Sequence, residues 1–246
     1  SAHHGHMAIH RRGRGDGGFH PPGAWQIVPS GNLAGPNTQY LSADPNGDTA
    51  ADLIYITGDT IYTLTSQNAP GPNLTSATTG LGGTMTITYA PSSTVANSNN
   101  PPVMWLTRTV TASDGRGGVS TTRYDYEGGL YDHADRRFLG FRAIRTTLPC
   151  VAGEAACPYL KTWYRQDYGS VSKVERTEQR SGADRLRAVE LHEYTTNGNT
   201  APYTSLRTGS WGFQYDGLQV APACPGPTCL RTYTSTRYDA WGNQSE

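Results

Sequence analysis

The stretch RYDYEGGLYD (Arg123–Asp132), followed by RRFLGFR (Arg136–Arg142), decides the fold. Tyr124 and Tyr126 alternate with charged residues, which is the period of a β-strand with one side packed and the other facing water. Two glycines then allow a tight turn, and aromatic residues resume after it. The stretch therefore predicts a strand ending at the second tyrosine, a turn at the glycines, and a further strand over residues 138–147.

The same pattern continues on both sides of this stretch. Thr84–Tyr89 alternates strictly, with Met85, Ile87 and Tyr89 on one side and threonines on the other. Clusters of Gly, Asn, Asp and Pro separate such runs and are typical of turns. We therefore predict an all-β fold with antiparallel sheets, a propeller-blade-like hairpin followed by a β-sandwich or a shell-like meander. The expected strands are 53–56, 61–64, 84–89, 103–112, 119–126, 138–147 and 231–238, while 171–180 and 185–194 fit either exposed strands or short helices around a turn that favours a hairpin.

Composition limits the classes of function. Among 246 residues there are 15 Tyr and 5 Trp, and 20 Lys and Arg balance 20 Asp and Glu, so that the formal net charge is zero. A neutral chain is not steered toward nucleic acid or an anionic membrane. No run approaches the roughly 20 apolar residues of a spanning helix. We expect a folded protein with no nucleic-acid partner and no membrane span.

Changes in composition divide the chain into three parts. Residues 1–22 are rich in His, Arg and Gly and almost free of apolar residues, so we interpret them as a tag remnant and a disordered tail. Pro, Ser and Asn gather over residues 90–102 without periodicity, which indicates a boundary. We predict an FG-GAP-like hairpin and strand region over 23–95 and a β-sheet, shell-like region over 96–246.

A short acidic loop is the sharpest local signal. Asp44, Asn46, Asp48 and Asp52 take its first, third, fifth and ninth places. Oxygen ligands at alternate positions of a tight turn converge on one point, which suits Ca²⁺. The loop resembles the calcium loops of FG-GAP repeats, except that Thr49 stands at the sixth place where those loops carry glycine. The alternative is an Asx-rich turn held by its own backbone hydrogen bonds.

The four cysteines fall into two close pairs, Cys150 with Cys157 and Cys224 with Cys229. Short loops containing Pro or Gly are easily closed, so we expect two local disulfides in an exported protein. A four-cysteine zinc site is the alternative, although the spacing of the first pair exceeds the usual gap of two to four residues. Free thiols are the third possibility.

The sequence carries no nucleophile elbow, no His-Glu-x-x-His and no phosphate-binding glycine loop. His133 beside Asp132, and His192 beside Glu193, are candidate bases, but neighbours in sequence on a strand point to opposite sides. We therefore expect no enzymatic activity. One basic cluster could bind nucleic acid or sugar, although such arginines more often form a solvated face: Arg136, Arg137, Arg142 and Arg145.

The opening stretch resembles the middle region of the B component of bacterial insecticidal toxin complexes and of related plasmid-virulence proteins. Strands in that family carry a Tyr-x-Tyr, a Gly-Gly turn and a Phe-Leu-Gly-Phe signature. Residues 81–93 agree with the pattern that precedes it, and YDAWGN, residues 238–243, is similar to the core of an RHS repeat. The matching signature residues are Tyr124, Tyr126, Gly128, Gly129, Phe138, Leu139, Gly140 and Phe141.

This resemblance implies a role. In that family the region forms part of a β-sheet shell that encloses a toxic polypeptide, with a propeller nearby that docks onto a translocation component. The chain would then be a structural scaffold, secreted or at the bacterial cell surface, with other segments of its parent shell and the translocation component as partners. Its signature aromatics would be packing residues. The alternative is a carbohydrate- or receptor-binding β module of a surface protein, which the many tyrosines and tryptophans suggest.

Overall fold

The computed structural model describes residues 39–57, 60–66, 73–98, 102–150, 153, 155–198, 200–218 and 229–245. The chain divides into two units, Ser1–Asn73 and Leu74–Glu246, which are described separately. The tail expected over residues 1–22, the turn between 57 and 60, and Cys224 lie outside the described residues.

The first unit contains a three-stranded antiparallel sheet in the order β1–β2–β3. Its strands are β1 (Gln39–Ala43), β2 (Asp52–Thr57) and β3 (Thr60–Leu64). Leu53 pairs with Leu64, which confirms the expected hairpin, and β1 adds a third strand. Tyr55 is fully buried, and its ring stacks on Tyr62 with 4.7 Å between the centroids. A single tyrosine therefore forms the centre of this small sheet.

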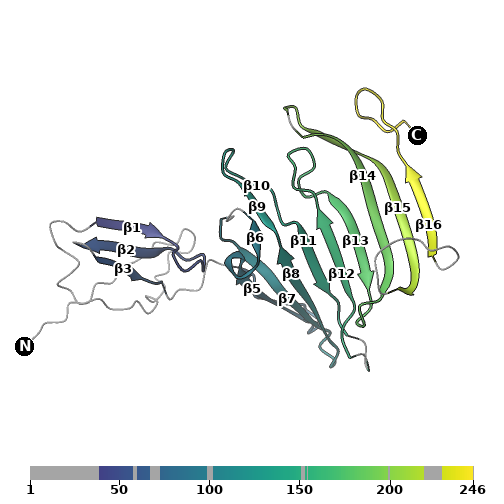
Figure 1. Ribbon diagram of the computed structural model, residues 1–246. Helices are drawn as coiled ribbons and strands as arrows, with labels where there is room; N and C mark the ends of the chain where they lie inside the picture. The colour runs from purple at the N-terminus through teal and green to yellow at the C-terminus, as the bar shows by residue number, and fades with distance from the viewer. Residues whose placement is uncertain are drawn as a thin grey trace, which may run out of the picture. The chain divides into compact units, whose positions relative to one another are not determined.

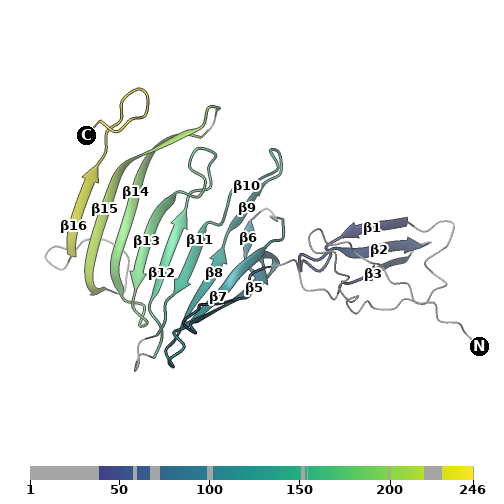
Figure 2. The ribbon, with the colours of Figure 1, turned by 180° about the vertical axis from the view of Figure 1, so that it is seen from behind.

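The second unit is built on one ten-stranded sheet in the order β4–β5–β7–β8–β11–β12–β13–β14–β15–β16, antiparallel throughout. Figures 1 and 2 view it from opposite sides, and among the described residues no α-helix covers either face. The all-β prediction is confirmed, and within the described chain the sheet is a single-layered meander. The strands are β4 (Ser76–Thr78), β5 (Thr84–Pro91), β7 (Trp105–Ser113), β8 (Val119–Glu127), β11 (Ala143–Thr147), β12 (Tyr159–Tyr164), β13 (Val174–Arg180), β14 (Leu186–Asn197), β15 (Thr204–Leu218) and β16 (Cys229–Ser235).

A small sheet branches from the main one. It contains β10 (Arg137–Phe138), β9 (Gly129–Asp132) and β6 (Asn97–Ser98), and β6 pairs with β9 in parallel. The strand expected over 138–147 was wrong in its extent, because the chain leaves strand geometry over 139–142 and resumes it at β11. Gly140 has a φ of +86°, which is outside the β region and interrupts the strand.

Two further expectations are settled by strand pairing. The segments that fitted either strands or helices are strands β13 and β14, joined as a hairpin. The boundary expected between residues 95 and 96 separates strands that are neighbours, because β5 pairs with β7 from Thr84–Ser113 to Pro91–Trp105. The division between the units falls instead after Asn73.

The buried cluster of the main sheet lies on one face of β14 and β15. Leu186, Val189 and Tyr215 are at most 7% exposed, and partly buried Leu191, Phe213 and Cys229 pack around them. Because the sheet is one layer deep, neighbouring side chains on the same face must provide the cover that a second layer would supply.

Candidate functional site

The signature turn joins the small sheet to the main sheet at Gly128. Its N–H donates to the carbonyl of Ala96 over 2.8 Å, and its own carbonyl accepts from the N–H of Arg142 over 3.1 Å. The φ of Gly128 is +68°, and an added Cβ would lie 2.7 Å from Cβ of Arg142. The turn therefore requires glycine both for its backbone conformation and for the close approach of the next segment.

The second glycine of the turn is equally confined. A Cβ on Gly129 would lie 2.5 Å from Oδ1 of Asn97 and 3.0 Å from the ring of Phe141. The side-chain amide of Gln166 donates to the carbonyls of Gly128 and Gly140, over 2.7 and 2.8 Å. One glutamine thus holds both glycine segments of the signature, although nothing in its sequence context marked it.

The aromatic signature residues pack against one another. The ring centroid of Phe141 lies 5.1 Å from that of Tyr126 and 5.5 Å from that of Phe138, and the Tyr126 hydroxyl donates to the carbonyl of Thr107 over 3.1 Å. Leu139 is only 6% exposed, and burial raises the pKa of Tyr126. These contacts are those of packing residues. Tyr124 lies on β8, where its carbonyl accepts from Arg108.

The acidic loop of the first unit forms the hydrogen bonds of an Asx-rich turn. Asp44 accepts from the N–H of Asp48 at 3.0 Å and from that of Thr49 at 2.8 Å. Asn46 also accepts from the N–H of Asp48, which in turn accepts from the N–H of Ala50. Thr49 takes the left-handed conformation, with φ +70°, so the residue that departs from the calcium-loop pattern still makes the turn.

Asp52 is the loop residue whose carboxylate is only partly hydrogen-bonded. It is 2% exposed; its Oδ1 accepts from the N–H of Ser66 over 2.7 Å, while its Oδ2 is buried without a hydrogen-bond partner. Among the described residues no three His, Cys, Asp or Glu side chains come together as a metal-holding group. An orphaned buried carboxylate oxygen still fits a hard cation, because an uncompensated buried charge is costly.

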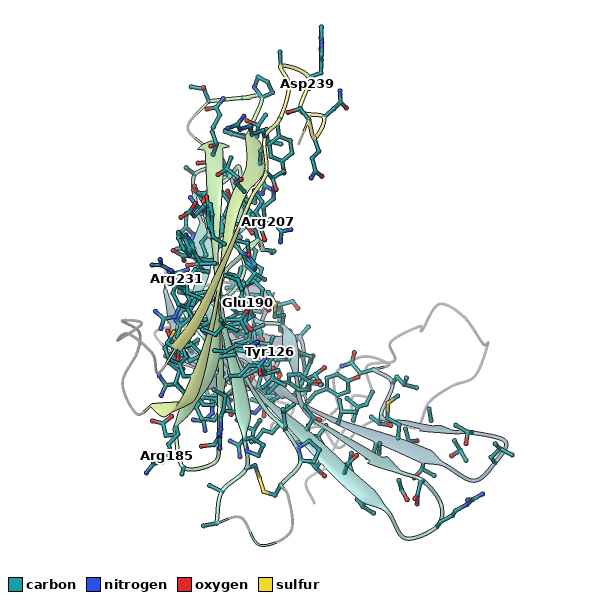
Figure 3. The ribbon with its side chains drawn as sticks, turned by 90° about the vertical axis from the view of Figure 1, so that its right-hand side faces the viewer. Tyr126, Arg185, Glu190, Arg207, Arg231 and Asp239 are labelled. Atoms are coloured by element: carbon teal, nitrogen blue, oxygen red, sulfur yellow. A yellow bond between two sulfur atoms is a disulfide. The ribbon has the colours of Figure 1, made fainter. Side chains whose placement is uncertain are left out.

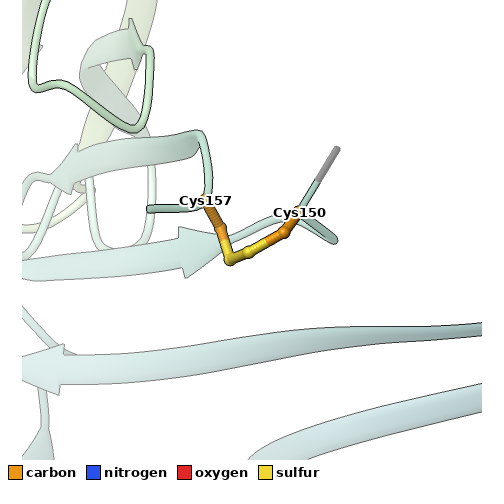
Figure 4. The surroundings of a disulfide bond; sticks show 2 residues. All are labelled: Cys150 and Cys157. Atoms are coloured by element: carbon orange, nitrogen blue, oxygen red, sulfur yellow. A yellow bond between two sulfur atoms is a disulfide. The ribbon is translucent and has the colours of Figure 1, made fainter. Parts of the chain in front are cut away.

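The first cysteine pair is a disulfide. Cys150 and Cys157 are bonded across the loop between β11 and β12, with 4.3 Å between their Cα atoms (Figure 4). This confirms the expected local pairing and excludes zinc as the role of these two residues. Cys229 is also disulfide-bonded, while Cys224, its expected partner, lies outside the described residues.

The candidate bases do not form the pairs that their sequence positions suggest. Asp132 accepts a hydrogen bond from the hydroxyl of Tyr168, and His133 packs on the ring of Tyr131. Glu193 lies with Trp211 and Tyr233, each of which donates to it. The carboxylates beside both histidines are therefore engaged by aromatic donors.

Strand register places a different group around His192. Its Nδ1 lies 3.1 Å from Oγ of Ser210, and its Nε2 lies 4.0 Å from Glu190. Burial, with a contribution from the charge of Arg207, lowers the pKa of His192. The order resembles a serine–histidine–acid row, but β15 is paired on both sides, so its N–H groups serve the sheet and not an oxyanion.

The structure does not bring the basic cluster together. Arg136 lies in the turn between β9 and β10 with a φ of +50°, and Arg137 stands 5.3 Å over the ring of Tyr168. Arg142 forms an ion pair with Glu175 over 2.5 Å. Arg145 points to the face of the main sheet on which Lys161 and Glu178 lie, and Arg142 lines a hollow on that face.

That face is the candidate functional surface, and we call it the cation–aromatic face. Cross-strand partners in two adjacent rows define it over β11–β16. The first row is Arg145, Lys161, Glu178, Val189, Phe213 and Arg231, and the second is Ala143, Trp163, Arg176, Leu191, Trp211 and Tyr233. Because neighbours along a strand point to opposite sides, the intervening residues form the other face. Figure 3 looks along the sheet and shows Arg231 on the side opposite Arg207 and Tyr126.

Cations lie over rings throughout this face. The guanidinium of Arg145 is 3.7 Å from the ring centroid of Tyr159, and that of Arg231 is 5.3 Å from that of Trp211. Lys161 and Arg176 both stand over Trp163, at 5.1 and 5.2 Å. Such cation–π contacts stabilise by about 0.5–1 kcal/mol each at exposed sites.

A buried acid ties the middle of the face together. Glu178 is 4% exposed and forms ion pairs with Arg176 and, over 2.8 Å, with Arg180. Beside it lies a hollow of about 730 Å³, lined by these charged residues, by Tyr159, Lys161 and Trp163, and by Leu191. Sequence reasoning missed this surface because its members are far apart in the chain and only the register aligns them.

More than half of the chain matches a known protein family. The model of the family described as insecticide toxin TcdB middle/N-terminal region matches residues 14–169. No curated protein matches the chain. Among the described residues, none of the helices has the length and apolar character needed to cross a membrane.

Solved structures show the same fold at low identity. A crystal structure of TcdB2–TccC3 is similar with a TM-score of 0.61 and 15% identity, over 84% of this chain and 14% of that one. The Tc holotoxin pore of Photorhabdus luminescens is similar with a TM-score of 0.61 and 15% identity, over 88% and 14%. TcdB2–TccC3 without its hypervariable C-terminal region gives 0.56 and 14%, over 77% and 13%. This chain therefore spans about one seventh of the length of the chains it matches.

Proposed function

Because this chain belongs to the insecticide toxin TcdB middle/N-terminal region family, we propose that it forms part of a β-sheet wall that encloses a toxic polypeptide in a secreted bacterial toxin complex. The observation that carries the proposal is the family match over more than half of the chain. The ten-stranded, single-layered sheet supports it, since such a sheet separates two sides without a second layer. Its role is structural and not catalytic.

The proposed partners follow from the same likeness. The similar solved structures contain TccC3 together with TcdB2, and one is a holotoxin pore. We assign to this chain the corresponding partners, namely further wall segments and the component that translocates the complex's contents. Among the described residues β4 and β16 lie at the edges of the sheet, which supports this assignment, because unpaired strand edges pair readily with further strands.

Calcium remains a proposal for the first unit. The buried, unpartnered Oδ2 of Asp52 and the oxygens of Asp44, Asn46 and Asp48 are the atoms that would hold it. A bound divalent cation would supply charge compensation in the loop before β2, and so fix the start of that strand. The chelation experiment given in the Discussion tests this role.

A labelling experiment tests the wall. Ser120 and Thr121 are adjacent exposed residues of β8 on opposite faces, and free cysteines are absent from the described residues. Ser120→Cys and Thr121→Cys therefore each add one reactive thiol at nearly the same place. In the isolated chain a bulky maleimide should label both. In the assembled full-length complex it should label only the outer one, and equal labelling of both would refute the wall.

A further inference from the structure

The two faces of the main sheet differ in chemistry. Over β11–β16 the cation–aromatic face carries five Arg or Lys at register positions of its strands: Arg145, Lys161, Arg176, Arg180 and Arg231. The cross-strand partners that point to the other side are mostly Thr, Ser, Gln and Leu, such as Thr162 with Thr177 and Gln214 with Leu230. The other side also places Arg165 and Lys173 over the ring of Tyr194, but Arg165 pairs with Asp167 and Lys173 donates to the carbonyl of Ser205. A ligand that needs unpaired cations beside rings would therefore choose the cation–aromatic face.

The ends of the first row offer unused donors. Among the described residues, neither the guanidinium of Arg145 nor that of Arg231 forms a hydrogen bond or an ion pair, and both residues are exposed. The cross-strand neighbour of Arg145 on β8 is Asp125, which pairs with Arg108 and Arg123 instead. Each guanidinium lies over a ring, 3.7 Å from the centroid of Tyr159 for Arg145 and 5.3 Å from that of Trp211 for Arg231, and its N–H groups can donate to a carboxylate.

Between these ends the charges are already satisfied. Lys161 pairs with Glu127 over 2.7 Å, and Glu178 is held between its two arginines. Val189 is buried, so partly buried Phe213 supplies the apolar surface of the row, and the hollow lies beside its charged half. The row is thus cationic at both ends, self-neutralised near the hollow, and apolar toward β15.

The distance between Arg145 and Arg231 sets the length of the ligand. Arg145 and Arg231 are five strand spacings apart in one row, about 24 Å at about 4.8 Å per spacing. An extended polypeptide advances about 3.3 Å per residue, so about seven residues cover that span. We propose that the cation–aromatic face binds an extended polypeptide that crosses the strands, with two acidic residues about seven positions apart and apolar residues between them.

A polypeptide fits this pattern better than a nucleic acid. A nucleic-acid strand carries a negative charge on every nucleotide, and would place phosphates over Glu178, Val189 and Phe213. The inference rests on the proposed function in one respect: the polypeptide that the wall encloses is the source of this segment, which makes the cation–aromatic face the inner one. The affinity of the face for such a segment can be measured on the chain alone.

The experiment titrates the full chain into a fluorescent ten-residue peptide with one glutamate near each end, seven positions apart, and leucine, phenylalanine and serine between. Arg145→Gln and Arg231→Gln keep a polar side chain with two methylene groups and remove the charge. Arg207→Gln is the matched control, because Arg207 is exposed, lies on a neighbouring strand and points to the opposite face. Circular dichroism of each variant establishes that the sheet is intact.

We expect the peptide to bind the unmodified chain, each single variant to weaken binding about threefold and the double variant about tenfold. Arg207→Gln should change the affinity by less than twofold. A peptide with lysines in place of the glutamates should not bind, and one with adjacent glutamates should bind like the single variants.

Four results would overturn the inference. They are no binding at millimolar concentration, equal binding of the lysine peptide, an unchanged affinity in the double variant, and tighter binding of a single-stranded oligonucleotide of the same length. None of these results bears on the proposed wall, which the labelling of Ser120→Cys and Thr121→Cys tests separately. Conversely, equal labelling of both thiols with intact peptide binding would refute the wall proposal and leave the binding inference intact.

Discussion

Replacing Gly128 by alanine tests whether the signature turn is built around the absence of a side chain. An alanine at a φ of +68° costs about 1 kcal/mol in backbone strain. The added Cβ would also lie 2.7 Å from Cβ of Arg142, so the segment leading into β11 must shift, which adds about 2 kcal/mol. We expect Gly128→Ala to destabilise the second unit by about 3 kcal/mol and to lower its melting temperature by about 6–12 °C.

A second glycine separates the two causes. Gly82 has a φ of +85°, but no atom lies within 4 Å of a Cβ added there. Gly82→Ala should therefore show the backbone cost alone, about 1 kcal/mol, or about 2–4 °C in melting temperature. Both variants are compared with the unmodified chain by calorimetry and by urea unfolding. If the two alanines cost the same, the close approach of Arg142 does not constrain the turn, and our account of the signature is wrong.

Three further predictions concern the acidic loop, the disulfide and the partly buried His192. Millimolar calcium should raise the melting temperature of the first unit by mass action, EDTA should reverse this, and Asp52→Asn should abolish it; a midpoint unchanged by chelation would reject the site. Replacing Cys150 and Cys157 together by serine should lower the free energy of unfolding by about 2 kcal/mol, since the bond closes a short loop, and equal denaturation midpoints would contradict this. Burial lowers the pKa of His192, so its contribution to stability is complete above pH 6.5 and is lost as the pH falls through the pKa of the folded state. The free energy of unfolding, measured in urea at pH 7, 6 and 5, should therefore fall less steeply with pH in His192→Gln than in the unmodified chain. An equal fall in both would exclude this role.

The local signals in the sequence predicted most of the strands. Strict alternation in Thr84–Tyr89 corresponds to β5, and the tyrosines before the paired glycines correspond to β8, because period-2 burial is a local property of a strand. The Gly182–Asp184 turn correctly favoured a hairpin over helices for β13 and β14. The cysteine spacing predicted the bond between Cys150 and Cys157.

The domain boundary could not be read in the same way. The breakers over residues 90–102 mark a real interruption of strand geometry, where the chain leaves β5 at Pro91 and forms the short β6. The chain then returns to pair Trp105 with Pro91 in the same sheet. Composition reports where a strand stops, whereas the edges of a unit depend on pairings between distant segments. A loop that returns to its own sheet therefore resembles a linker in sequence.

The single layer also explains why the cation–aromatic face is charged. Without a second sheet, rings such as Trp163 and Trp211 can be shielded from water only by side chains of their own face. Lys161 and Arg176 do this with cationic ends that lie over Trp163, and each also forms an ion pair, so these cations are part of the packing as well as of the charge pattern. Removing either of them would expose a ring and confuse loss of binding with loss of structure. Arg145 and Arg231, at the two ends of the row, form no ion pair among the described residues, so glutamine there removes charge without leaving a carboxylate unpaired, and this is why the binding inference stands or falls on them.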